Sequence, residues 1–388
     1  MEIRDYLAEL VRAQLENRKP LPVPEGITTE QLMEIAGNNH MDYLLLGALV
    51  RAEGLTGEEQ EKARTRVKRS VIRTLAQIME LKQIEQRFEE EHVKSQPMKG
   101  ARMKFIYPSP EMREMSDIDI LIDAESMERA KKVLLEMGYC LKRSVKHHDI
   151  YHKPPFMVVE AHRAMYDKTV DNNQYKYFSG FTKAVLREGM QYTYDFTTED
   201  FYVYMMAHMA KHFYTMGCGI RNLVDVYIYL EKYGPEMNRQ YVNEELKNCG
   251  ILEFTEHIEK LAYIWLKGEK GSQFYDDLFL YMLNSGIYGK DENGIWNKFS
   301  EEKMKDHEVT LKELKKWYYF PPVSYMSEYY PWLEEHPYLL PVAWGIRAYR
   351  GIFLKKGVHK REMLQDIEQE QARVYKNIYQ KMQLHFKR

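Results

Sequence analysis

The sequence predicts an α+β fold in which a small mixed β-sheet is enclosed by large helical regions, so that the chain is mostly α overall. Residues 1–92 and 196–388 carry apolar side chains at intervals of three and four, the spacing of amphipathic helices. Between them, residues 93–195 carry short apolar runs at 117–122 and 156–159, a pattern typical of strands. We therefore expect a helical N-terminal region, an α/β core and a helical C-terminal region with these boundaries.

Composition and charge narrow the classes of function. The chain has 388 residues, of which 44% are hydrophobic and 13% aromatic, so a large core is expected and long disordered stretches are not. Its net charge of −2 gives no strong nucleic-acid signal. Cys140, Cys218 and Cys249 are too scattered for a disulfide framework or a thiolate zinc site. A signal-peptide core and an apolar run of about 18 residues are both missing, so we expect a cytoplasmic protein that does not enter a membrane.

The N-terminal region is expected to form helices separated by turns. Apolar side chains make one stripe over residues 3–11, and prolines in segment 20–24 then interrupt the helical pattern. Thr28 or Thr29 can cap the next helix, because a threonine hydroxyl accepts a hydrogen bond from a free backbone N–H. A longer amphipathic helix includes residues 67–81. Helical cover for the core is the expected role of this region.

The core is expected to contain a strand, a helix and another strand. Residues 117–122 form the first strand. A helix from about Ser126 to Met137 ends at Gly138, since glycine readily adopts the left-handed conformation that closes helices. The run at 156–159 begins the next strand. This order suits a small mixed sheet.

The C-terminal region returns to a helical pattern. Buried helices are expected at 201–213 and 221–233, an amphipathic helix at 303–319 and a long charged helix at 360–386. Residues 318–341 contain too many prolines for a continuous helix, so we expect a packed connector there.

Two acids on the first core strand are the strongest candidates for chemistry. Asp117 and Asp119 are two positions apart, so their side chains leave the same face of a strand, roughly 7 Å apart. Carboxylates held that close repel unless a cation lies between them. A divalent metal that carries the phosphates of a nucleotide would fill that role. The alternative is an edge strand with one solvated face.

Glu160 is a candidate third acid on a separate strand. In Val158–His162 the polar and apolar residues alternate, so Glu160 faces the side opposite to Val159. Three carboxylates from two strands could hold Mg²⁺ or Mn²⁺ for an in-line phosphoryl displacement. Glu160 could also act as general base on an acceptor hydroxyl. Taken alone, Glu160 could equally be a half-exposed strand acid.

A basic turn precedes the two acids. Gly100 lets the backbone approach phosphates closely, and Lys99 and Arg113 are natural phosphate ligands, arginine as a bidentate fork and lysine as a point charge. Solvated loop charges are the alternative interpretation for both basic residues.

These residues resemble a known family in their order along the chain. The matching residues are Met98-Lys99-Gly100-Ala101, Tyr107-Pro108, Arg113, Ser116 to Ile122, Gly138-Tyr139 and Glu160-x-His162. The pattern is similar to the nucleotidyltransferase superfamily that includes DNA polymerase beta, and more narrowly to the bacterial family of uncharacterised nucleotidyltransferases. The resemblance covers residues 93–165 and extends loosely to a helix with His208 and His212, followed by Asp225. In two respects the chain departs from the superfamily: Ala101 replaces the usual serine, and the interval from Gly100 to Asp117 is longer.

The resemblance implies transfer of a nucleoside monophosphate from an NTP to an acceptor, with release of pyrophosphate. It implies that Asp117, Asp119 and Glu160 hold Mg²⁺ or Mn²⁺. The nucleotide-binding residues would be Lys99, Gly100, Ala101, Arg113 and Ser116. The acceptor, whether an antibiotic, a sugar phosphate, a protein side chain or an RNA end, would be selected by the helical regions.

The histidines allow other interpretations. His208 and His212 are four residues apart on one helix face, which fits a hydrogen-bonded pair shared with Asp225, a metal pair, or a helix that lines the cleft. His162 is a further candidate for the cleft. A histidine-metal phosphohydrolase using residues 147–152 is a weaker alternative, because such sites draw ligands from several helices.

A second class of function remains open. The chain could be a catalytically silent nucleotide-binding module that regulates or binds a protein partner. The alanine at position 101 and the large helical fraction favour this alternative.

Overall fold

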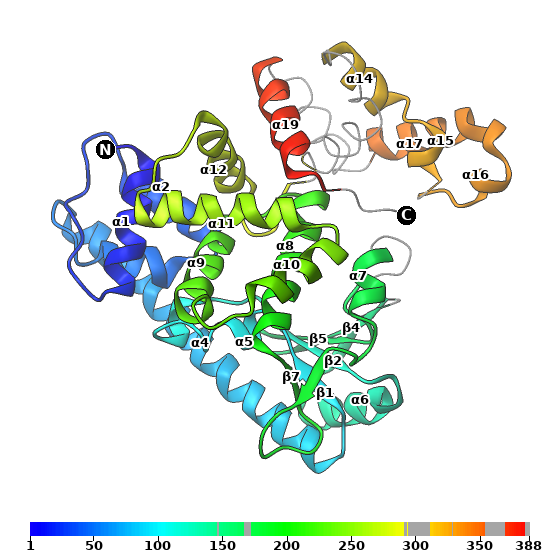
Figure 1. Cartoon of the computed structure of the whole chain (residues 1–388), viewed down its shortest axis with the longest axis horizontal. Helices are drawn as coiled ribbons and strands as arrows, with labels where there is room; N and C mark the ends of the chain where they lie inside the picture. Colours follow the sequence, from blue (N-terminus) through cyan, green and yellow to red (C-terminus); the bar gives the residue numbers. More distant parts are fainter. Residues whose placement is uncertain are drawn as a thin grey trace.

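The computed structural model describes residues 1–145, 147–166, 172–290, 293, 311–327, 329–353 and 369–384. Helices enclose a small mixed sheet, so the fold is α+β as the sequence predicted (Figure 1). The strands are β1 (Ser95–Pro97), β2 (Ile118–Ile122), β3 (Cys140–Ser144), β4 (His148–Lys153), β5 (Met157–His162), β6 (Ala184–Leu186) and β7 (Tyr194–Phe196). The helices before the sheet and within the core are α1 (Ile3–Leu15), α2 (Thr29–Asn38), α3 (Gly47–Leu49), α4 (Gly57–Glu90), α5 (Gly100–Met103), α6 (Met127–Glu136) and α7 (Asn172–Tyr177).

The helices that follow the core are α8 (Thr198–Thr215), α9 (Arg221–Tyr233), α10 (Arg239–Asn248), α11 (Leu252–Lys267), α12 (Gln273–Ser285), α14 (Leu311–Tyr319), α15 (Val323–Met326), α16 (Trp332–Glu335), α17 (Leu340–Phe353) and α19 (Gln369–Met382). Within the described ranges, no helix is long and apolar enough to cross a membrane.

The main sheet has the strand order β1-β2-β5-β4-β3. Strands β2 and β5 are parallel, and the other neighbours are antiparallel. In the parallel pair Asp119 lies opposite Glu160, one residue after the pair Ile118 and Val159. This register places the two acids on one face of the sheet and the two apolar residues on the other.

The apolar face of the sheet packs against α4 and α6. Ile118 and Ile120 of β2 and Val159 of β5 share one buried cluster with Leu81 and Ile84 of α4. Helix α4 begins with a capping box: Thr56 accepts a hydrogen bond from the Glu59 backbone, and the Glu59 carboxylate accepts one from the backbone of Thr56. Because α4 and α6 cover this face, the opposite, acid-bearing face is left for α8 and α9.

Most elements predicted within the core are confirmed, with ends shifted by one residue or so. Helix α6 and strands β2 and β5 lie where the sequence indicated. The expected helices 303–319 and 360–386 lie partly outside the described residues. The expected packed connector at 318–341 is confirmed in its described part: no continuous helix crosses it, and the short helices α15 and α16 pack on a small apolar cluster before α17 begins. Pro341 is tolerated in the first turn of α17, where the backbone N–H needs no partner within the helix.

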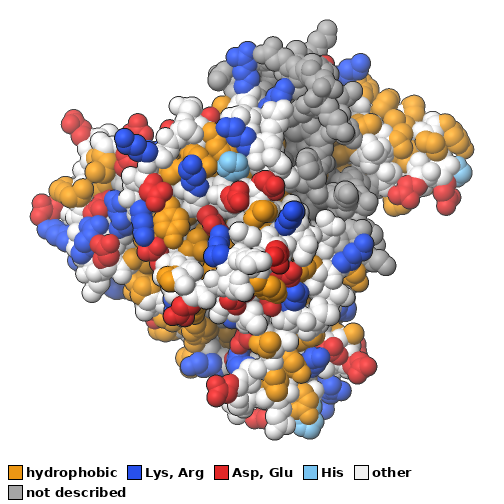
Figure 2. All heavy atoms as spheres, in the orientation of Figure 1, with side chains coloured by type: hydrophobic (Ala, Val, Ile, Leu, Met, Phe, Trp, Pro, Cys, Tyr) orange, Lys and Arg blue, Asp and Glu red, His pale blue; other side chains and the backbone are white. Residues whose placement is uncertain are grey.

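The surface of the α15–α17 segment is rich in hydrophobic side chains. Figure 2 shows them at the right of the molecule, whereas Lys, Arg, Asp and Glu are intermixed over the remaining described surface. Tyr329, Tyr338, Val342 and Tyr349 are each more than half exposed. Beneath them, Met326 and Leu333 form a small separate core.

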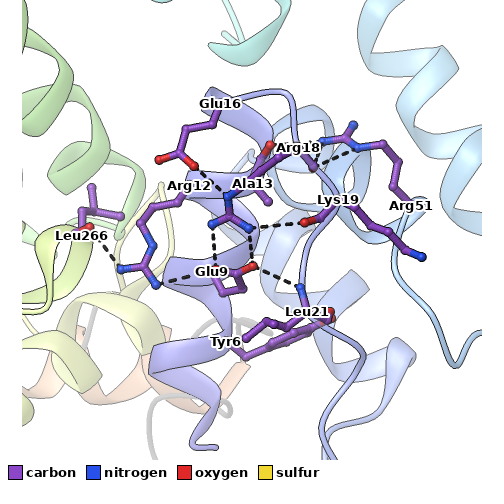
Figure 3. Close-up of polar contacts among 10 residues, drawn as sticks. All are labelled: Tyr6, Glu9, Arg12, Ala13, Glu16, Arg18, Lys19, Leu21, Arg51 and Leu266. Atoms are coloured by element: carbon purple, nitrogen blue, oxygen red, sulfur yellow. Dashed lines mark hydrogen bonds and ion pairs between the residues drawn. The ribbon is translucent and has the colours of Figure 1, made fainter.

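A buried carboxylate connects α1 to the segment that follows it. Glu9 accepts two hydrogen bonds from the Arg18 guanidinium, at 2.6 and 2.8 Å, and one from the backbone N–H of Leu21 (Figure 3). Hydrogen bonds from Arg18 hold the pKa of Glu9 below its usual value. Glu9 therefore fixes the turn after α1 in its ionised form.

We expect Glu9→Gln to lower the free energy of unfolding by about 2 kcal/mol, because the charge-assisted hydrogen bonds between the buried Glu9 carboxylate and the half-exposed Arg18 guanidinium are weakened. A lowered pKa in the folded state stabilises the protein above the unfolded value of 4.5, so the difference from wild type should shrink as pH falls below it. Urea unfolding at pH 7 and pH 4 measures both effects. Glu16→Gln is the matched control, since Glu16 also binds Arg18 but is exposed. Equal losses in the two variants would contradict the prediction.

Candidate functional site

The two parallel strands bring the predicted acids together. Asp119 lies next to Glu160 across the β2–β5 ladder, and Asp117, the residue just before β2, lines the same cavity. The ligand atoms of Asp119, Glu160 and His162 all lie within 4.8 Å of one another. Alternation along each strand explains this: the isoleucines and Val159 enter the core, so the acids must face the other way.

The acids open into a cavity of about 290 Å³ between the sheet and the helices that follow the core. From the core, its lining residues include Lys99, Gly100, Arg113, Ser116, Asp117, Asp119 and Glu160. From α8, α9 and the segment after α12, they include Tyr204, His208, His212, Arg221, Asn222, Asp225 and Tyr288. The core side of the cavity thus carries the three acids together with Lys99 and Arg113, and the helical side carries histidines, Arg221, Asp225 and aromatic groups.

Two cationic side chains contact Asp119. The Lys99 ammonium donates a hydrogen bond to Asp119 Oδ1 at 2.7 Å, and His162 Nε2 approaches the same oxygen at 2.8 Å. His162 Nε2 also lies 3.4 Å from Glu160 Oε2. His162 is buried behind the two acids, where it positions them by bridging their carboxylates.

Protonation in the site follows from these contacts. Burial alone would raise the pKa of Asp119, but Lys99 and His162 outweigh it and hold that pKa well below its usual value. For His162, burial would lower the pKa, whereas its hydrogen bonds to Asp119 and Glu160 raise it. Hydrogen bonding from His162 also lowers the pKa of Glu160. Asp119 and Glu160 are therefore ionised.

Asp117 lacks the hydrogen bonds from Lys99 and His162 that stabilise the ionised form of Asp119. Burial, followed by repulsion from Asp119, raises its pKa to about 6. Among the described residues, no hydrogen bond or ion pair engages its carboxylate. Asp117 is a half-buried carboxylate on the cavity wall with no cation bound to it among the described residues. A divalent ion would complete this environment, because carboxylate oxygens are the ligands that Mg²⁺ prefers. The side chains present therefore fit a metal held by Asp117, Asp119 and Glu160.

The turn before the acids has an uncommon backbone. The Met98 N–H donates to the Asp119 carbonyl at 2.9 Å, which extends the β1–β2 ladder by one residue. Lys99 then takes a positive φ of 48°, a conformation that side chains other than glycine rarely adopt. This turn starts α5 and directs the Lys99 side chain toward Asp119. Such local strain is typical of residues that have a functional position.

Gly100 is closely packed beside this turn. A Cβ at position 100 would lie 3.0 Å from Met115 Cβ and 3.7 Å from Arg113 Nη1. We expect Gly100→Ala to lower the free energy of unfolding by about 1–2 kcal/mol, because the Met115 backbone must move to accept the methyl group. Nucleotide affinity should fall as well. Thermal unfolding and nucleotide titration measure the two effects. Gly57→Ala is the control: nothing lies within 4 Å of its added Cβ, so no loss is expected. Equal stability of the two variants would contradict the predicted contact.

The other predicted nucleotide-binding residues lie in different surroundings. Arg113 lines the cavity, but its Nε donates to Asp225 at 2.7 and 3.0 Å. Ser116 lines the cavity and its hydroxyl contacts His40 Nδ1 at 3.3 Å and the Tyr288 hydroxyl at 2.9 Å. Ala101 is buried against the sheet, and its N–H donates to the Met98 carbonyl. Ala101 could thus support the turn but has no side-chain contact with the cavity.

The histidines divide into two groups. His208 and His212 line the cavity, with their Nε2 atoms 3.1 Å apart. The suggested bond to Asp225 is wrong, because Asp225 instead accepts hydrogen bonds from Arg113 and Tyr107. Within the part of the chain that the structure describes, residues 147–152 provide no metal cluster of their own. His148 Nε2 lies 4.0 Å from Glu160 Oε2, at the limit of an ion pair.

Several cavity residues were not anticipated from the sequence. Arg221, Asn222, Tyr204 and Tyr288 line the wall opposite the acids. They follow no motif, and they come from segments that lie more than forty residues after Glu160, the last of the three acids. Only the tertiary arrangement of α8, α9 and the segment after α12 brings them to the site.

Comparison with known proteins identifies the family of the chain. Neither a curated protein nor a solved structure matches the chain. A family model, described as uncharacterised nucleotidyltransferase, matches residues 25–267. The match extends from α2 to α11 and therefore includes the acid-bearing strands and most of the facing helices. The chain belongs to this family of uncharacterised nucleotidyltransferases.

Proposed function

We propose that the protein transfers a nucleoside monophosphate from an NTP to an acceptor hydroxyl or phosphate, using a core similar to that of DNA polymerase beta. An acceptor oxygen attacks the α-phosphorus, and a new O–P bond forms as the bond to the bridging α–β oxygen breaks. Pyrophosphate leaves, and a proton released from an acceptor hydroxyl passes to Glu160.

Each acid has a part in this reaction. Asp117, Asp119 and Glu160 would hold Mg²⁺ or Mn²⁺, which supplies charge stabilisation for the attacking and leaving oxygens when bound. The Glu160 carboxylate is ionised and half-buried at the cavity wall, so it can accept a proton. Lys99, Gly100, Arg113 and Ser116 lie along the same wall and would orient the phosphates, with Ala101 supporting the turn.

One observation carries the proposal. In a member of a nucleotidyltransferase family, two carboxylates on neighbouring strands and a third from the residue just before β2 line one cavity. The direct pairing of Asp119 with Glu160 fixes their separation more firmly than loop residues could. The helices that form the opposite wall would select the acceptor, either a small molecule or a macromolecule.

Incubation with each labelled NTP, Mg²⁺ or Mn²⁺ and cell extract tests the proposed activity. We expect metal-dependent release of pyrophosphate together with a labelled product. Saturable NTP binding without either product would contradict nucleotidyl transfer.

The Lys99 contact favours a second candidate, a catalytically silent nucleotide-binding module. An ammonium 2.7 Å from Asp119 Oδ1 occupies an oxygen that a metal would use. If this contact excludes metal, wild type should not bind Mn²⁺, whereas the Lys99→Met variant should bind it. Metal binding by wild type would contradict the silent module.

A further inference from the structure

The cavity wall opposite the acids contains a buried guanidinium whose charge is poorly matched. Arg221 is the first residue of α9 and only 8% exposed, and it lines the cavity. Its Nη1 donates to the Glu114 carbonyl at 3.2 Å, and its Nε has no hydrogen-bond partner. Among the described residues, no carboxylate forms an ion pair with it. Buried arginines are normally paired, so this one calls for a ligand.

The neighbours of Arg221 do not supply that ligand. Arg113 Nη1 donates to the same Glu114 carbonyl, so two guanidinium groups share one neutral acceptor. The Asp225 carboxylate, four residues further along α9, already accepts hydrogen bonds from Arg113 and from the Tyr107 hydroxyl, each at 2.7 Å. The Glu114 carboxylate accepts the backbone N–H of Tyr43, and burial raises its pKa. The result is an excess of positive charge at Arg221.

The effect on protonation agrees with the geometry. Burial and then the charge of Arg113 lower the pKa of Arg221 to about 10. Burial, Arg221 and two further arginines lower the pKa of nearby His40 to about 4, so its ring is neutral at pH 7. Both pKa values are lowered, and a bound anion would raise them, because it stabilises the protonated, positively charged forms of Arg221 and His40.

We propose that Arg221 forms an anion subsite for a substrate phosphate group, on the wall facing the three acids. Asn222, the next residue of α9, lines the cavity beside it, and the positive end of the α9 dipole adds to the attraction. A guanidinium binds phosphate in bidentate geometry, which an unpartnered Nε allows. The proposal deepens the proposed function, because the phosphate would belong either to the NTP tail or to the acceptor.

The binding test uses the full chain without metal, so that it does not depend on nucleotidyl transfer. Inorganic tripolyphosphate is titrated in EDTA, and affinity is measured by calorimetry and by the rise in melting temperature. We expect wild type and Asp119→Asn to bind, whether or not transfer activity is ever detected. No binding by the wild type would overturn the subsite.

Variants at Arg221 locate the binding. Arg221→Gln should weaken tripolyphosphate binding at least tenfold, and Arg221→Lys, which keeps the charge but loses the fork, at least threefold. Arg239→Gln is the matched control, because Arg239 lies on the neighbouring α10 but is paired with Glu259. The affinity of this variant for tripolyphosphate should match that of wild type. If Arg221→Gln does not fold, Arg221→Lys decides. Wild-type affinity in a folded Arg221 variant would overturn the proposal.

Nucleotides distinguish the two sources of phosphate. If the NTP tail occupies the subsite, wild type should bind ATP at least tenfold more tightly than AMP, and Arg221→Gln should remove that preference. If the acceptor carries the phosphate, Arg221→Gln should leave ATP affinity unchanged and lose only orthophosphate binding. Either result supports the subsite and assigns it to one substrate.

Discussion

Replacing Asp119 by asparagine should reduce metal-dependent nucleotidyl transfer by about 10³-fold, equivalent to about 4 kcal/mol of transition-state stabilisation. The substitution keeps the shape of the side chain but removes the charge that lies nearest to Lys99, His162 and Glu160. Pyrophosphate release under saturating NTP and Mg²⁺ measures the loss. Circular dichroism verifies the fold, which we expect to persist because the amide can still accept from Lys99.

A second aspartate in the same sheet provides the control. Asp149 on β4 is also buried and ion-paired, with Arg163 Nη2 at 2.6 Å, but it does not line the cavity. Asp149→Asn should cost stability and leave the activity of the folded protein near wild type. Turnover retained in Asp119→Asn would remove the metal mechanism, and equal loss in both variants would indicate a structural effect.

The sequence predicted the acidic wall of the site because that wall is made by local rules. Alternation along a strand places Asp117 and Asp119 together, and the same rule orients Glu160. The family resemblance added the turn at Lys99 and Gly100. The predicted order of strand, helix and strand was enough to expect β2 and β5 to be neighbours in one sheet. The main features of the core could therefore be anticipated.

The opposite wall could not be predicted in the same way. Arg221 and Tyr288 meet the acids only through the packing of α9 and the segment after α12, which no short-range spacing encodes. Lys99 shows a related limit: its positive φ, which aims its ammonium at Asp119, is set by the β1–β2 ladder and the close packing of Gly100. As a lysine beside a glycine turn, Lys99 was predicted to bind phosphate, whereas in the structure its ammonium binds Asp119.

The Arg113–Asp225 pair joins the core to α9, and Asp225→Asn should therefore have the largest effect on stability. Asp225 is 3% exposed and accepts hydrogen bonds from Arg113 and Tyr107. Without its charge, Arg113 and Arg221 remain buried side by side with little compensation. Breaking one partner of a buried pair costs about 3–5 kcal/mol, and we expect a loss in unfolding free energy within that range. Urea unfolding measures it.

A double-mutant cycle separates lost pairing from lost packing. Arg113→Met alone should also destabilise, but Arg113→Met combined with Asp225→Asn should cost less than the sum of the single changes, by about 1–3 kcal/mol, because no uncompensated charge remains between them. Tyr107→Phe, which removes one hydrogen bond to Asp225 and no charge, should cost only about 1 kcal/mol. Additive effects of Arg113→Met and Asp225→Asn would contradict a coupled ion pair. Coupling would instead show that the charges of Arg113 and Asp225 both set the electrostatics of the cavity and hold α9 against the core. A ligand bound at Arg221 would then also affect the contact between α9 and the core.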